Sequence, residues 1–146
     1  LQKIVSLSAA IASSAFGGRE QFDARVFVLP DVGEVTNYCI WRQQDATRNS
    51  VAGLAQAHFS HRELHGKDSR AMQDMLHAKG VNWNDCPTVQ KRGACLVRET
   101  YAIPNEREPG APDVVRHRWI VDEEIPVFTQ DRRYIEKYVY PERTSP

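Results

Sequence analysis

Trp41-Arg-Gln-Gln-Asp-Ala-Thr-Arg-Asn-Ser50 is the stretch that decides the fold, because it is a polar block inside a long amphipathic segment. Apolar residues recur at helical spacing on both sides of it and predict one helix from about Glu34 to Phe59. At about 100° per residue, four of its polar side chains fall within roughly 120° of the helix circumference: Arg42, Asp45, Arg48 and Asn49. This stripe suits a recognition surface, and it equally suits a network of helical salt bridges.

Weaker signals place the other elements around this helix. The pattern predicts a helix over residues 1–16 that ends at Gly17-Gly18, and a strand over Phe22–Leu29 that Pro30 stops. Further along we expect a polar connection over Ser60–Lys67, a short helix from Asp68 or Ser69 to Gly80, a loop over Val81–Cys86, a turn from Pro87, strands over Ala94–Ile103 and Val114–Val121 joined by an exposed loop, and a helix over Asp131–Tyr140. This order predicts an α+β sandwich in a single domain, 1–146, with helices on one face of a mostly antiparallel sheet.

The amino-acid composition is ordinary for a soluble globular protein. The net charge is zero, but residues 40–99 hold nine Lys and Arg against six Asp and Glu. This surplus permits contact with phosphates without requiring it. The sequence has no apolar stretch near the ~18 residues that a membrane span needs. Three cysteines without CxxC spacing indicate reduced thiols and a cytoplasmic protein.

The segment from Lys79 to Gly93 is the second candidate for a binding surface. Asn82 and Asn84 offer amide donors and acceptors around Trp83, which offers a stacking plane. The flanking cations Lys79, Lys91 and Arg92 could contact phosphates. The alternative is a loop that packs its tryptophan into the core and uses asparagines as turn residues.

Two further groups suggest metal chemistry. His58, His61 and His65 have the spacing of a metal-binding helix face, although the segment leaves a helix and no fourth ligand is evident. We therefore expect no metal there and surface or RNA-facing histidines instead. Asp23 is a weak candidate for a catalytic carboxylate, because two-metal chemistry needs more than one such group and pairing with Arg25 is the simpler expectation.

Several motifs in order resemble the tRNA-histidine guanylyltransferase family, in particular its bacterial-type branch of 3′–5′ polymerases. They are Phe22-Asp-Ala-Arg25, Asn37-Tyr38, Trp41-Arg-Gln-Gln-Asp45, Arg48-Asn-Ser50, Phe59-Ser-His61, Lys79-Gly-Val-Asn-Trp-Asn-Asp85, Lys91-Arg-Gly93 and the stretch Ile120-Val-Asp122 to Ile125-Pro-Val-Phe128. The resemblance covers nearly the whole chain. It implies a polymerase-palm-like fold, two metal ions, and addition of nucleotides to the 5′ end of tRNA after activation by a nucleoside triphosphate.

The resemblance further implies Mg²⁺, ATP, GTP and tRNA for the complete protein, and a homotetramer. On this basis Arg25, Arg42, Asp45, Arg48, Asn49, Lys79, Asn82, Asn84, Lys91 and Arg92 are the candidate contacts to tRNA or triphosphate. Thr47-Arg48-Asn49-Ser50 stands where eukaryotic members have a histidine-containing block, which favours tRNA repair over strict tRNA-His maturation.

One departure from the family pattern concerns the metal site. The family's metal-binding carboxylates lie in an early motif and in a Ser-Asp-Glu motif, and neither is present. We therefore expect the C-terminal portion of such an enzyme, without its own magnesium ligands and inactive alone. The alternative is a non-catalytic RNA-binding module or a subunit complemented by another chain. Loss of one side of a palm sheet also predicts an unpaired sheet edge and exposed apolar surface, and with them aggregation or dependence on a partner.

Overall fold

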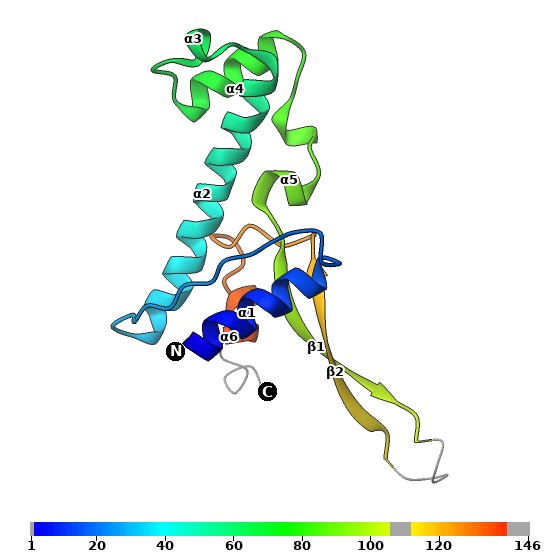
Figure 1. Cartoon of the computed structure of the whole chain (residues 1–146). Coiled ribbons are helices and arrows are strands. Elements are labelled where there is room, and N and C mark those ends of the chain that lie inside the picture. Colours follow the sequence, from blue (N-terminus) through cyan, green and yellow to red (C-terminus); the bar gives the residue numbers. More distant parts are fainter. Residues whose placement is uncertain (1, 106–111, 140–146) are drawn as a thin grey trace. The chain divides into compact units, whose positions relative to one another are not determined.

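The computed structural model describes residues 2–105 and 112–139, and Figure 1 shows their helices and strands. The predicted loop between the last two strands lies largely outside these residues. The chain divides into two compact units. Residues 1–28 and 95–122 form one, called here the hairpin unit, and residues 29–94 and 123–146 form the other, called the long-helix unit.

The hairpin unit contains one helix and a two-stranded sheet. Helix α1 (Gln2–Ala15) contacts strand β2, and strands β1 (Cys95–Ile103) and β2 (Val114–Asp122) pair antiparallel from Cys95 opposite Asp122 to Ile103 opposite Val114. Across the pair the Arg118 Nε donates to the Glu99 Oε2 at 2.6 Å. These elements confirm the predicted α+β class and hairpin.

The predicted strand over Phe22–Leu29 is wrong, because the structure has no strand there. Residue alternation is a local property, whereas a strand also needs a neighbour for its backbone hydrogen bonds. Among the described residues the sheet consists of β1 and β2 alone. Four apolar side chains of this segment are exposed: Val28 at 93%, Val26 and Phe27 near half, and Phe22 at 40%.

Apolar side chains of α1 and the hairpin are also largely exposed. Ile4 and Leu7 are 59% and 57% exposed, and the described part of α1 has no buried residue. Residues Ala10, Ile11, Ser14 and Ala15 of α1 and Trp119 of β2 line an open pocket. The predicted aggregation or dependence on a partner stays a prediction, but these side chains are the kind of surface that would drive it.

The long-helix unit is built on helix α2 (Val32–His58), which confirms the predicted long helix. The Asp31 side chain caps it by accepting a hydrogen bond from the Glu34 amide at 3.1 Å. The buried face of α2 includes Ile40, Val51 and Ala55. Further along the chain come α3 (His61–Leu64), α4 (Ser69–Ala78), the 3₁₀ helix η1 (Trp83–Asp85), α5 (Thr88–Arg92) and α6 (Arg133–Val139).

The end of α2 carries its own small core. Ala55, Leu64 and Leu76 are buried together, with partly buried Met72 and Met75 packed against them. The predicted cap at Asp68 is confirmed, since its carboxylate accepts from the Ala71 amide at 2.8 Å. Helix α3 replaces part of the predicted polar connection. It begins with a reciprocal capping box between Ser60 and Glu63.

Candidate nucleic-acid interface

The polar face of α2, defined by Arg42, Asp45, Arg48 and Asn49, exists as predicted. Asp45 lies at its centre and accepts hydrogen bonds from Arg42 at 3.5 Å, Arg48 at 3.4 Å and Asn49 at 3.4 Å. Both arginine side chains remain more than half exposed. Exposed ion pairs of this length contribute only about 0–1 kcal/mol. The guanidiniums are therefore held in place loosely enough to exchange Asp45 for another anion.

Trp41 belongs to the same face, although we did not include it among the candidate contacts. It is 50% exposed, and its ring lies 5.6 Å from the Arg42 guanidinium and 5.9 Å from the Tyr38 ring. At about 100° per residue, Trp41 falls between Asp45 and Arg48 on the helix circumference. That angle could have identified it from the sequence. An exposed aromatic ring among arginines is suited to stacking on a base.

In the loop around η1 the tryptophan packs against the protein, which is the alternative to a stacking plane for a base. Trp83 is partly buried, and its Nε1 donates to the Ser50 Oγ at 3.0 Å, which ties η1 to α2. Asn82 accepts from the Asn84 backbone at 3.1 Å and donates to Asp85 at 3.1 Å, as a turn residue does. Lys91 donates to the Asn84 carbonyl at 2.7 Å. The loop thus stands beside α2, and its asparagines hold the turn together.

Lys79 and Arg92 have structural surroundings of their own. The Lys79 ammonium donates to the His58 carbonyl at 2.6 Å and lies 4.0 Å from the centre of the Phe59 ring. A cation at this position complements the negative end of α2. The Arg92 Nε is buried and has no hydrogen-bond partner within the described part of the chain. An anion that reached Arg92 would satisfy that group.

Asp23 and Arg25 lie in the hairpin unit and form an ion pair with each other. The Arg25 Nε is 3.3 Å from the Asp23 Oδ2, and both side chains are more than four-fifths exposed. The expected pairing is confirmed. An exposed carboxylate that already faces a guanidinium is a poor ligand for Mg²⁺, which binds through carboxylates and water oxygens.

The structure gives no support to a metal site in the regions that it describes. Within residues 2–105 and 112–139, no three His, Cys, Asp or Glu side chains are grouped as metal ligands would be. The three clustered histidines divide among the end of α2, the start of α3 and the residue after α3. The described residues therefore do not fit the Mg²⁺ that the family resemblance implies.

The surroundings of Cys39 and Glu63 shift the pKa values of their side chains. Burial raises the pKa of the Cys39 thiol, and none of Cys39, Cys86 and Cys95 forms a disulfide. Hydrogen bonds from the Ser60 hydroxyl and backbone amide lower the pKa of Glu63. Both shifts report local structure, since neither group belongs to the polar face of α2.

Among the described helices, none combines the length and apolar character that crossing a membrane requires.

Comparison with known proteins shows which proteins this chain is similar to. The chain aligns over 96% of its length, at 43% identity and a TM-score of 0.69, with a solved bacterial tRNA(His) guanylyltransferase-like protein in complex with ATP, and covers 58% of that chain. A structure of such a protein in complex with GTP matches at 43% identity over 96% of this chain and 56% of the other, with a TM-score of 0.65. No protein-family model matches the chain.

A curated sequence gives the same answer. The tRNA(His) guanylyltransferase of Debaryomyces hansenii is 30% identical in an alignment 89 residues long, which covers 53% of this chain and 34% of that protein. The chain is thus similar to a tRNA(His) guanylyltransferase and, over nearly its whole length, to bacterial guanylyltransferase-like proteins, as its motifs predicted. It spans little more than half of the length of the two solved ones.

Proposed function

We propose that the complete protein adds nucleotides in the 3′–5′ direction to the 5′ end of tRNA, as a guanylyltransferase or in 5′-end repair, and that this chain alone is inactive. The observation that carries the proposal is the identity to the bacterial relatives across nearly the whole chain. The polar face of α2 supports it, because two exposed guanidiniums and an exposed tryptophan suit phosphates and bases.

In this proposal the chain supplies recognition rather than metal chemistry. Arg42 and Arg48 contact phosphates of tRNA or of ATP and GTP, and Asn49 adds an amide beside them. Asn82, Asn84, Lys91 and Arg92 extend that surface from the neighbouring loop, and Lys79 and Arg25 are further contacts. Mg²⁺, which would neutralise charge during phosphoryl transfer, is held by residues outside this chain.

The proposed setting is the cytoplasm, and the proposed assembly is a homotetramer of the complete protein. The three cysteines, which form no disulfide, are consistent with a reducing compartment. The exposed apolar side chains of the hairpin unit are consistent with self-association. Sedimentation of the complete protein would test the tetramer directly.

An activity assay tests the division of labour. The chain is mixed with a 5′-truncated tRNA, Mg²⁺, ATP and GTP, and addition to the 5′ end is measured beside tRNA binding. We expect binding without extension. Extension would show that this chain holds a metal site, and Asp23 would be the first residue to substitute. Absence of tRNA binding would refute the proposal.

A matched pair of variants tests the polar face of α2. Arg48→Ala should weaken tRNA binding several-fold and lower the slope of log affinity against log salt by about one, since one phosphate contact is lost. Arg116→Ala removes an exposed arginine of the hairpin and serves as the control. Equal effects of the two substitutions would remove the polar face from the proposal.

A second candidate function is a non-catalytic RNA-binding module. It is favoured by one observation, the lack of a metal-ligand cluster among the described residues. The coding region upstream of Leu1 separates the two candidates. Metal-binding carboxylate motifs there support the enzyme, and a start codon directly before this chain supports the module.

A further inference from the structure

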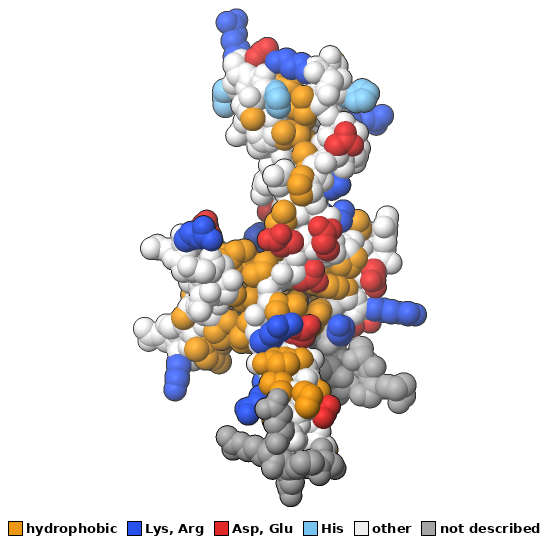
Figure 2. Space-filling model, turned by 90° about the vertical axis from the view of Figure 1, so that its right-hand side faces the viewer, with side chains coloured by type: hydrophobic (Ala, Val, Ile, Leu, Met, Phe, Trp, Pro, Cys, Tyr) orange, Lys and Arg blue, Asp and Glu red, His pale blue; other side chains and the backbone are white. Residues whose placement is uncertain are grey.

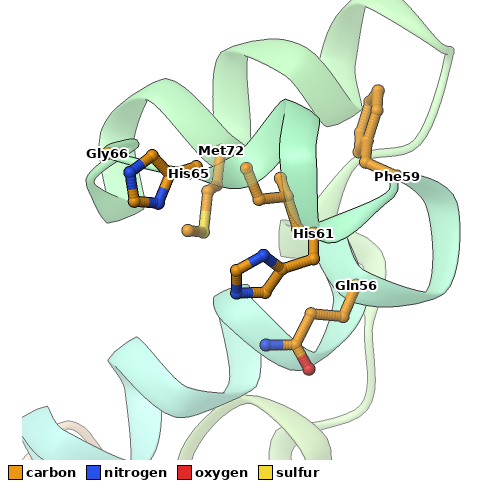
Figure 3. A pocket seen from close by; sticks show the side chains of 7 residues that line it. Gln56, Phe59, His61, His65, Gly66 and Met72 are labelled. Atoms are coloured by element: carbon orange, nitrogen blue, oxygen red, sulfur yellow. The ribbon is translucent and has the colours of Figure 1, made fainter.

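A pocket of about 560 Å³ opens where α3 and α4 meet the end of α2 (Figure 3). It has apolar and polar lining groups in one place. The apolar part is Phe59, Leu64 and Met72, and the polar part is the Gln56 amide with the imidazoles of His61 and His65. The two imidazole rings lie 6.3 Å apart. This volume falls within the range of small-ligand sites.

The lining chemistry favours a flat heteroaromatic ring with hydrogen-bonding edges. The amide and the imidazoles can each donate and accept, and no carboxylate lines the pocket. The nearby carboxylates have other tasks, since Glu63 accepts from Ser60 and Asp68 caps α4. A nucleobase combines an apolar face with an edge of donors and acceptors and is the ligand class that this lining matches best.

Cationic side chains accompany the pocket residues along the chain. Arg62, Lys67 and Arg70 are exposed, and no residue in the described ranges forms an ion pair with any of them. Figure 2 shows blue cationic and pale-blue histidine side chains gathered on this end of the long-helix unit. These cations can hold the phosphates on either side of a base in the pocket.

The pocket also continues the polar face of α2. At about 100° per residue, Gln56 lies on the same side of the helix as Asp45 and Asn49. It stands about 12 Å along the axis from Arg48. Ala52 and Gly53, which lie between them on this side of the helix, are small, and a Cβ added at Gly53 would meet nothing within 4 Å. One nucleic-acid strand can therefore follow α2 from the arginines to the pocket.

We propose that the pocket holds one unstacked nucleobase of the bound tRNA, with Gln56 and His61 hydrogen-bonded to its edge. The identity of the RNA rests on the proposed function, whereas the pocket is a site additional to the arginines of α2. Free ATP or GTP presents the same chemistry, so the test includes both sources of the base.

The test uses the full chain and measures affinity for a tRNA transcript. Gln56→Ala and His61→Ala should each raise the Kd about tenfold, because contacts to a single base are worth that much. His61→Asn, which keeps a hydrogen-bonding group, should recover part of the loss. His77→Ala removes an exposed histidine of α4 outside the pocket lining and should stay within twofold of the unaltered chain. Thermal unfolding confirms that all variants are folded.

The possible results separate the two proposals. If both pocket variants stay within twofold while Arg48→Ala weakens binding, the pocket proposal is wrong and the proposed function stands. If the unaltered chain binds no tRNA, the proposed function fails and the pocket proposal fails with it. A loss of ATP affinity in His61→Ala without a change in tRNA affinity would assign the pocket to the free nucleotide and overturn the RNA occupant. Photocross-linking of thiouridine-containing tRNA to residues 56–72 would support the proposed RNA occupant.

Discussion

Replacing Gln43 tests the contact that holds α2 to the segment before α6. Gln43 is 7% exposed, its Nε2 donates to the Pro126 carbonyl at 2.8 Å, and its Oε1 accepts from the Phe128 amide at 2.9 Å. Gln43→Ala leaves both the Pro126 carbonyl and the Phe128 amide without this hydrogen-bond partner. A buried group left unpaired costs about 1–3 kcal/mol, so two of them should lower the free energy of unfolding by roughly 2–5 kcal/mol. For a chain of this size that corresponds to a Tm lower by roughly 5–15 °C.

The assay is urea unfolding together with hydrogen exchange at the Phe128 amide, which reports on the long-helix unit itself. The matched control is Gln44→Ala, the exposed neighbour on the same helix, which should change the unfolding free energy by less than about 0.5 kcal/mol. Protection of the Phe128 amide should fall in Gln43→Ala alone. Equal unfolding free energies for the two variants would refute the reasoning, since they would show that the paired amide contributes nothing beyond its helix position.

Three further predictions follow from the long-helix unit. Leu76→Ala should lower the free energy of unfolding in urea by about 2–5 kcal/mol, because this side chain of α4 is fully buried in the small core at the end of α2. An effect below about 1 kcal/mol would contradict the assigned core. Ser60→Ala should raise the pKa of Glu63 in an NMR titration. The stabilisation from ionised Glu63 is complete above its unfolded pKa and is lost as pH falls through its lower folded pKa, so the variant should lose less stability on acidification. Asp45→Asn should strengthen tRNA binding several-fold at low salt, because it frees two guanidiniums from a carboxylate, and unchanged affinity would show that they do not contact the RNA.

The helices could be predicted from the sequence because their signals are local. Caps at Asp31 and Asp68 and apolar periodicity lie within a few residues of each element, and the structure confirms them. The start of helix α3 could also have been predicted, since Ser60 and Glu63 have capping-box spacing. Its four residues are too few to show a helical periodicity of apolar side chains. The expected strand over residues 22–29 failed because pairing depends on a partner that the local sequence does not specify.

The residues of the candidate site likewise fall into those that local spacing predicts and those that depend on long-range contacts. Helical geometry fixes which residues share a face, so the cluster of Arg42, Asp45 and Arg48 followed from spacing alone. The roles of Lys79 and Trp83 did not, because their partners His58 and Ser50 lie 21 and 33 residues away in the chain. Such contacts exist only once the tertiary structure forms.

Helix α2 therefore links stability to recognition through its two faces. Its buried face, with Val51 and Ala55 nearly inaccessible, packs in the core, while its polar face presents the arginines. The ion pairs to Asp45 are too weak to order that surface by themselves, so its geometry depends on the packing behind it. RNA binding should accordingly respond to changes in the core as well as to changes in the arginines. The two causes differ in the salt dependence of binding, which falls only when a phosphate contact is lost.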